Sequence, residues 1–229
     1  MNLRPGIILQ ARYASTRLPG KALERIGRYT ILEHCLQRLL GSGVTRIVLA
    51  TTTRPEDDPL VETARRTGVL VYRGSNEDVL GRFAAAAETY DLDPVIRATG
   101  DNPAVDPGGA SRLLQALART GADYVQESGL PHGAALEAMT APALHYAASA
   151  AITPYDREHV TTFIKSHPAT FCLRTIAAPP ALTDPSLSVT VDTAEDLAWV
   201  RELFDLVGSI EPAVSELIAA GRAQRREVA

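Results

Sequence analysis

Short apolar runs alternate with helix-like segments through the first half of the chain. Each run is rich in Ile, Leu and Val, which is typical of a strand buried on both faces. The expected strands are residues 7–9, 45–51, 69–72 and 94–98. Apolar positions at helical spacing follow each strand, at residues 31–40, 59–67, 79–90 and 109–119. Strands separated by helices predict a parallel sheet with helices on both faces.

The pattern changes after about residue 120, where strand-like and helix-like segments no longer alternate regularly. Further strands are expected at residues 123–126, 135–139, 170–176 and 187–192, and further helices at 142–151, 156–166, 194–207 and 211–220. Thr193 is expected to cap the helix 194–207, with Asp196 at capping-box spacing, and residues 222–229 are expected to fray. We interpret the chain as one domain, 1–229, in which residues 123–176 leave the sheet to contact a substrate or a second subunit.

A polar loop with three cations follows the first strand. Arg12, Ser15, Arg17 and Lys21 lie among small residues, and Lys21 is one of only two lysines in a chain that otherwise uses arginine. A loop between a strand and a helix lies at the carboxyl end of a parallel sheet, where α/β proteins bind ligands. Cations there favour a polyanion such as a phosphate chain, although an exposed basic loop is the alternative.

Two carboxylates occupy the same kind of position in the chain. Asp101 follows the expected strand 94–98, and Asp192 ends the expected strand 187–192. Magnesium typically takes one or two protein carboxylates together with water and phosphate oxygens. The pair therefore predicts a metal site above the sheet, whereas a turn or a helix cap would explain each residue alone.

Composition narrows the class of protein. The chain has 45% hydrophobic and 22% charged residues, which is ordinary for a globular protein. Its net charge of −4 gives no excess of basic residues for binding nucleic acid. No apolar run is long enough to span a bilayer, and the first residues lack the pattern of a signal peptide. We therefore expect a cytoplasmic protein in which Cys35 and Cys172 are free thiols.

The motifs together resemble a known enzyme family. Residues 10–21, QARYASTRLPGK, resemble the signature of cytidylyltransferases that activate acidic sugars, and the branch most similar is the SpsF-like family. The same order of motifs continues at 74–80, 97–107, 157–161 and 190–197. The resemblance implies an α/β fold: a three-layer GT-A, Rossmann-like nucleotidyltransferase with a mixed, mostly parallel sheet.

The resemblance also implies roles for individual residues. CTP would lie against Gln10, Ala11, Arg12, Ser15, Arg17, Lys21, Arg73, Gly74, Ser75, Asp78 and Thr99. Lys21, Arg17, Asp101 and Asp192 would be catalytic, with Mg²⁺ on Asp101 and Asp192. Glu137, Arg157 and His159 would face the acceptor. The partners implied are CTP, a small anionic acceptor and a second copy of the chain in a homodimer.

Three readings of the function stay open. The first is transfer of CMP from CTP to an acidic sugar, with release of pyrophosphate. The second is the same transfer to a small phosphonate or phosphate, whose oxygen is already ionised and needs no protein base. The third is an inactive nucleotide-binding dimer, which the combination of Lys21, Asp101 and Asp192 disfavours. His132, Ser188 and Thr162 depart from residues frequent in relatives and leave the acceptor undecided.

Overall fold

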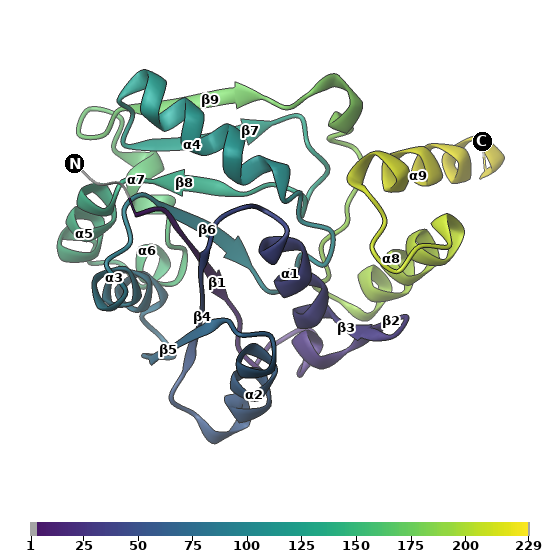
Figure 1. Cartoon of the computed structure of the whole chain (residues 1–229), viewed down its shortest axis with the longest axis horizontal. Helices are drawn as coiled ribbons and strands as arrows, with labels where there is room; N and C mark the ends of the chain where they lie inside the picture. Colours follow the sequence, from purple (N-terminus) through teal and green to yellow (C-terminus); the bar gives the residue numbers. More distant parts are fainter. Residues whose placement is uncertain (1–3, 229) are drawn as a thin grey trace.

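A seven-stranded mixed sheet forms the centre of the molecule (Figure 1), with the strand order β5-β4-β1-β6-β8-β7-β9. The computed structural model describes residues 4–228. The sheet strands are β1 (Gly6–Gln10), β4 (Arg46–Thr52), β5 (Leu70–Gly74), β6 (Val95–Thr99), β7 (Tyr124–Ser128), β8 (Glu137–Met139) and β9 (Leu173–Ala177). Four of the six strand pairs are parallel, and the two pairs made by β8 are antiparallel. The mixed, mostly parallel sheet predicted from the sequence is confirmed.

Helices cover both faces of this sheet. The helices are α1 (Ile31–Leu40), α2 (Asp58–Arg66), α3 (Val79–Thr89), α4 (Gly108–Thr120), α5 (Ala141–Ala150), α6 (Pro154–Glu158), α7 (Thr162–Ser166), α8 (Ala194–Val207) and α9 (Val214–Val228). A small hairpin of β2 (Arg25–Ile26) and β3 (Tyr29–Thr30) precedes α1. The helix predictions for the first half of the chain are correct to within a residue or two.

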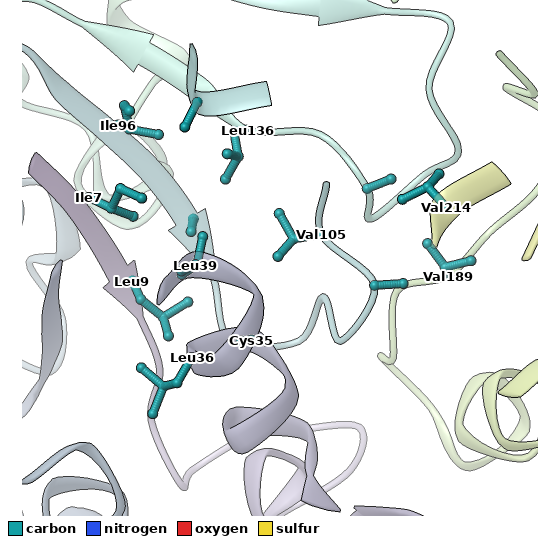
Figure 2. Close-up of a cluster of buried hydrophobic side chains, with 14 of the residues drawn as sticks. Ile7, Leu9, Cys35, Leu36, Leu39, Ile96, Val105, Leu136, Val189 and Val214 are labelled. Atoms are coloured by element: carbon teal, nitrogen blue, oxygen red, sulfur yellow. The ribbon is translucent and has the colours of Figure 1, made fainter. Parts of the chain in front are cut away.

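Alternation along β1 divides the core into two layers. Ile7 and Leu9 point to one face, where they pack with residues of α1 such as Cys35 and Leu36 (Figure 2). Ile8 points to the other face and packs in the cluster formed by α3, α5 and α7. Because successive strand side chains point to opposite faces, a strand apolar at every position must be covered on both sides.

The order in which strands are added to the sheet reverses at β1: β4 and then β5 lie on one side of it, and β6 lies on the other. Because β1 and β6 are parallel neighbours, the loops that follow them begin side by side at the carboxyl end of the sheet, where a crevice opens. The two loops begin in close contact. Gly100 N donates to Gln10 O at 2.7 Å, and a Cβ on Gly100 would lie only 2.7 Å from the Ala11 Cβ.

Capping boxes start two of the helices. Thr193 and Asp196 form the predicted capping box at the start of α8. Thr30 and Glu33 form a second capping box at the start of α1. Each box satisfies backbone N–H groups that have no partner within the helix. The second box fixes α1 directly after the hairpin, beside the polar loop.

The prediction of a sheet strand at residues 187–192 is wrong. This segment is extended and its Leu187, Val189 and Val191 are buried, but it pairs with loops. His132 N donates to Leu187 O, Val189 N donates to His132 O, and Val191 N donates to Asp101 O, at 2.8–2.9 Å. Alternating β-branched residues fit any extended segment with one buried face, so the pattern could not tell a sheet partner from a loop partner.

Residues 123–176 do not leave the sheet as a unit, contrary to the expectation. Strands β7, β8 and β9 belong to the same sheet, and only α5, α6 and α7 between them lie outside it. The helix expected at 156–166 is broken into α6 and α7 around His159, whose ψ of 88° is not helical. A hydrophobic pattern interrupted for three residues cannot be distinguished from a continuous helix by periodicity.

The C-terminal helix is longer than the sequence predicted. Helix α9 runs to Val228 and does not fray from Arg222, and Ala229 lies outside the described residues. Arg222 Nε and Arg225 Nη2 donate to Asp184 Oδ2 at 3.0 and 2.7 Å. This buried carboxylate holds the last turns against the preceding segment, a contact that no local pattern reveals.

Two further expectations concern the membrane and the cysteines. Across residues 4–228, no helix combines the length and the apolar character needed to cross a membrane. Cys35 is buried and Cys172 half-buried, and both are free thiols as predicted. Burial raises the pKa of Cys35 to about 12, so this thiol stays protonated and unreactive at neutral pH.

Candidate active site

A cavity of about 570 Å³ opens where β1 and β6 end. The loop after β1, the loop after β6, the start of α3 and the 187–192 segment contribute to its walls. Nine of the residues predicted to bind nucleotide or metal line it: Gln10, Ala11, Arg12, Ser15, Arg17, Lys21, Thr99, Asp101 and Asp192. The reversal of the strand order thus brings together the residues that the sequence placed after different strands.

Lys21 lies at the centre of a cluster on one wall of the cavity. Its Nζ donates to Asp101 Oδ2 at 3.0 Å, to Asp192 Oδ1 at 2.8 Å and to Val191 O at 2.9 Å. The Lys21 side chain is only 13% exposed. Gly20, with φ 72°, turns the loop into the short helix that carries Lys21. All three N–H donors of the ammonium are therefore directed at oxygen atoms.

Cations hold Asp192 in its ionised form. Burial on its own raises the pKa of Asp192, but the hydrogen bond and charge of Lys21, together with Arg17 at 3.0 Å, lower it overall. Both aspartates retain a second carboxylate oxygen that accepts no hydrogen bond within residues 4–228. The cluster thus offers ionised oxygen atoms to a ligand in the cavity.

Arg12 crosses to another wall of the same cavity. Its Nη2 lies 3.1 Å from Glu158 Oε1, and its Nη1 donates to Asn76 O at 3.3 Å. Glu158 and His159, at the end of α6, also line the cavity. The structure therefore places His159, a predicted acceptor residue, across from the loop predicted to bind CTP.

The predicted residues at the end of β5 and between β5 and α3 do not line the cavity. Arg73 is turned away, with its guanidinium on Asp58 and on the carbonyl oxygens of Thr52 and Arg54. Asp78 caps α3 and pairs with Arg157 at 3.3 Å. Five predicted site residues in this region are absent from the cavity lining: Arg73, Gly74, Ser75, Asp78 and Arg157. Ser75 affects the cavity indirectly, because its carbonyl oxygen accepts a hydrogen bond from Arg82, which does line it.

Comparison with known proteins identifies the family. Residues 6–206 match the family described as cytidylyltransferase. The chain is 35% identical to the spore coat polysaccharide biosynthesis protein SpsF of Bacillus subtilis, over 92% of this chain and 91% of that protein. This chain belongs to the cytidylyltransferase family. The resemblance stated from the sequence motifs is confirmed.

Solved structures of nucleotidyltransferases share the fold. A cytidylyltransferase from Leptospira borgpetersenii superimposes with a TM-score of 0.90 at 30% identity, covering 98% of this chain and 96% of that chain. A CMP:2-keto-3-deoxy-manno-octonic acid synthetase complexed with CTP superimposes with a TM-score of 0.67 at 19% identity, covering 88% of this chain and 98% of that chain. The predicted nucleotidyltransferase fold is confirmed.

In this cytidylyltransferase, the predicted acceptor residue Glu137 lies beneath the cavity and not on its surface. Its carboxylate accepts hydrogen bonds from Arg97 at 2.6 Å and Lys165 at 2.7 Å, and also from Tyr124 and Thr161. Burial raises the pKa of Glu137, but Arg97, Lys165 and these hydrogen bonds outweigh it and lower the pKa to about 2. Glu137 therefore stays ionised and fixes Arg97, which does line the cavity.

Sequence reasoning missed several residues of the cytidylyltransferase cavity. Arg82, Arg97, Asn102, His132, Gly133 and Thr190 also line it. Arg97 and Thr190 stand within the quoted motifs but were given no role. Arg82 lies in a helical pattern where a charged residue normally faces solvent, yet it is only 3% exposed. No signal in the pattern distinguishes a buried arginine from an exposed one.

The two aspartates fit a divalent cation. Within residues 4–228, no group of three or more His, Cys, Asp or Glu side chains is placed to hold a metal. A cation here would therefore take Asp101 and Asp192 as its protein ligands and complete its shell with phosphate oxygens and water, which is the usual pattern for magnesium. The oxygen donors match a hard cation, and their convergence on one Lys21 nitrogen shows that they face the same point.

Proposed function

We propose that this cytidylyltransferase transfers CMP from CTP to a small acidic sugar of the nonulosonic or KDO-like class and releases pyrophosphate. The observation that carries the proposal is the cluster of Lys21, Asp101 and Asp192 at the crevice between β1 and β6. It joins a cation suited to phosphate with two carboxylates suited to magnesium. Similarity to the spore coat polysaccharide biosynthesis protein SpsF and to the synthetase complexed with CTP supports a polysaccharide precursor and CTP.

The loop after β1 would bind the triphosphate. Arg12, Arg17 and Lys21 line the cavity and carry the positive charge that a triphosphate needs. An acceptor oxygen attacks the α-phosphorus, a new O–P bond forms, and the bond to the β-phosphate oxygen breaks as pyrophosphate leaves. Lys21 and Arg17 would neutralise charge on the departing pyrophosphate, because phosphoryl-type transfer depends mainly on positioning and electrostatic stabilisation.

Asp101 and Asp192 would hold Mg²⁺ when CTP binds. Bound there, magnesium supplies Lewis-acid polarisation of a phosphate oxygen. In the structure described, Lys21 contacts the oxygen atoms that would face the cation. Lys21 would therefore move from the aspartates to the phosphates as the metal nucleotide enters, which keeps the charge of the cluster balanced in both states.

A phosphonate or phosphate acceptor is the alternative within the same reaction. Five cationic side chains line the cavity, namely Arg12, Arg17, Lys21, Arg82 and Arg97, against the three carboxylates of Asp101, Glu158 and Asp192. An excess of cations suits an acceptor that carries one or two negative charges. The ionised oxygen of a phosphonate would need no deprotonation, whereas a sugar hydroxyl would need assistance from a base or a metal.

A pyrophosphate-release screen tests the proposed function. The purified chain is incubated with Mg²⁺ and each of CTP, ATP, GTP and UTP, crossed with sugar acids and small phosphonates. We expect release only with CTP and an anionic acceptor. Release with a sugar acid supports the proposal, and release with a phosphonate alone favours the alternative. Tight CTP binding without turnover on any acceptor would favour an inactive nucleotide-binding protein.

The homodimer is also a proposal. Helices α5 and α6 expose Tyr146 (52%) and Tyr155 (63%), and Ile152 between them is 90% exposed. Exposed large apolar side chains this close together in the chain support a protein contact here. Sedimentation equilibrium of the wild type and of Ile152→Glu tests this: a dimer that dissociates in the variant supports the proposal, and a monomeric wild type contradicts it.

A further inference from the structure

Two arginines of the cavity have most of their hydrogen-bonding capacity free. Arg82 and Arg97 each carry five N–H donors, but each side chain donates only one hydrogen bond within residues 4–228: Arg82 to Ser75 O and Arg97 to Glu137 Oε2. The Nε of each is buried and has no hydrogen-bond partner among the residues that the structure describes. Buried polar groups are normally paired, so these two guanidinium groups are arranged for a partner that the protein does not supply.

The protein holds both side chains in place for that partner. Glu137 orients Arg97 from below, and Glu137 is itself held by Lys165, Tyr124 and Thr161. Arg82 projects from α3 and is only 3% exposed. Burial, reinforced by the nearby charge of Arg12, lowers the pKa of Arg82 to about 10, which still leaves it charged at neutral pH. A buried cation without a carboxylate partner costs stability unless a ligand compensates it.

Neither arginine belongs to the Lys21 cluster. Lys21 and Arg17 pair with Asp101 and Asp192, so that group balances its own charge. Ile8 points to the face of the sheet that α3 covers, whereas Leu9 points to the other face. Arg97 is the register partner of Ile8 in the neighbouring strand, and Gln10 follows Ile8 by two residues. Both side chains therefore point to the α3 face. Gln10 Oε1 is also buried, and no group in residues 4–228 donates a hydrogen bond to it. The cavity therefore contains a second polar region, formed by Gln10, Arg82 and Arg97.

We propose that Arg82 and Arg97 bind the anionic group, a carboxylate or a phosphonate, of the acceptor. The inference rests on the proposed function, and it assigns the acceptor to the α3 side of the cavity and the triphosphate to the Lys21 side. Two guanidinium groups match the two or three oxygens of such an anion by bidentate hydrogen bonding. Gln10 adds an amide for a neighbouring hydroxyl or amine. A neutral acceptor would leave Arg82 buried and unpaired, so the pair selects against it.

Binding measurements separate this inference from the proposed function. Calorimetry first measures the affinity for α,β-methylene-CTP, which cannot release pyrophosphate. It then measures binding of 3-deoxy-D-manno-octulosonate, of its neutral methyl ester and of methylphosphonate in the presence of the saturating analogue. The variants are Arg82→Gln, Arg97→Gln and Arg97→Lys. Arg97→Lys keeps the positive charge but removes the planar guanidinium group that binds an anion through two hydrogen bonds. This variant still tests the inference if Arg97→Gln folds poorly.

Arg112→Gln is the matched control. Arg112 also pairs with carboxylates, the buried Glu127 at 2.5 Å and the half-buried Asp106 at 2.6 Å, but it does not line the cavity. We expect Arg82→Gln and Arg97→Gln to weaken binding of one anionic probe by about 10- to 100-fold, the loss of a charged hydrogen bond. We expect Arg112→Gln to leave that affinity unchanged, and all variants to keep their affinity for the CTP analogue. The probe that binds identifies the anion as a carboxylate or a phosphonate.

Each other outcome has a defined meaning. An analogue that fails to bind the wild type would refute the proposed function. An analogue that binds while neither anionic probe does would overturn the inference, as would equal binding of the neutral ester. The inference is also overturned if Arg82→Gln and Arg97→Gln lose the nucleotide analogue, because the two arginines would then bind the triphosphate.

Discussion

Lys21 Nζ lies 2.8 Å from Asp192 Oδ1 and 3.0 Å from Asp101 Oδ2, so one ammonium group bridges two carboxylates from distant parts of the chain. Lys21→Met should leave these carboxylates facing each other with only the exposed Arg17 nearby. We expect turnover to fall about 10²–10³-fold, while Mn²⁺ binds the nucleotide-free variant more tightly than the wild type. Mn²⁺ titration by electron paramagnetic resonance measures the second effect. Lys165→Met, the substitution of the other lysine, should not change the Mn²⁺ affinity.

Asp101→Asn tests the metal assignment directly. The amide keeps the shape of the side chain but removes the charge that a divalent cation needs. We expect turnover to drop about 10²–10³-fold with an unchanged melting temperature, as measured by pyrophosphate release and circular dichroism. Glu62→Gln, the same chemical change on the exposed face of α2, should behave as the wild type. Wild-type turnover in Asp101→Asn would contradict the assignment.

Gly133 controls the position of the segment that carries Asp192. Its φ is 92°, and a Cβ there would lie 2.6 Å from Thr190 N, a backbone atom that cannot move away alone. Gly133→Ala should therefore displace residues 187–192, cost roughly 3 kcal/mol of stability and lower turnover about 10²-fold.

Gly121 provides the control for that substitution. It also has a positive φ, 61°, but a Cβ there meets nothing within 4 Å. Gly121→Ala should cost about 1 kcal/mol from backbone strain without changing turnover. Urea denaturation and pyrophosphate release measure both quantities. Equal loss of turnover in the two variants would show that the contact with Thr190 does not matter.

The low pKa of Glu137 predicts acid sensitivity. Because the folded-state pKa is about 2 and the unfolded-state pKa about 4.3, the contribution of Glu137 to stability is complete above the unfolded value and is lost as the pH falls toward 2. The shift corresponds to about 3 kcal/mol. Urea denaturation at a series of pH values should show that the wild type is more stable than Glu137→Gln near neutrality and that the difference narrows in acid. A difference independent of pH would argue against an ionised Glu137.

The ion pairs of Asp184 with Arg222 and Arg225 should stabilise the C-terminal helix α9. Asp184 has a 7% exposed side chain and accepts from Arg222 and Arg225. Replacing both arginines by alanine leaves a buried carboxylate without a cation and should cost about 2 kcal/mol. Urea denaturation measures the change, and hydrogen exchange should show earlier opening of α9. Arg226→Ala, on an exposed neighbour, should change neither quantity.

The sequence alone determined the elements that depend on local pattern. Continuous apolar runs such as Ile7–Leu9 identified buried strands, helical spacing identified α1 and α3, and Thr193 with Asp196 identified the start of α8. The motif around Lys21 and the position of Asp101 after β6 were also readable. These features depend on residues close in the chain, where propensity and periodicity act directly.

Only the tertiary structure decided which distant residues meet. It replaced the expected strand at 187–192 by a segment docked on loops, extended α9 through Asp184, and placed Glu137 beneath the cavity. It also brought the buried Arg82 and the half-buried Arg97 to the same cavity as the polar loop. The physical reason is the same in each case: hydrogen bonds and ion pairs between residues far apart in the chain stabilise these arrangements, and such pairs leave no period or spacing in the sequence.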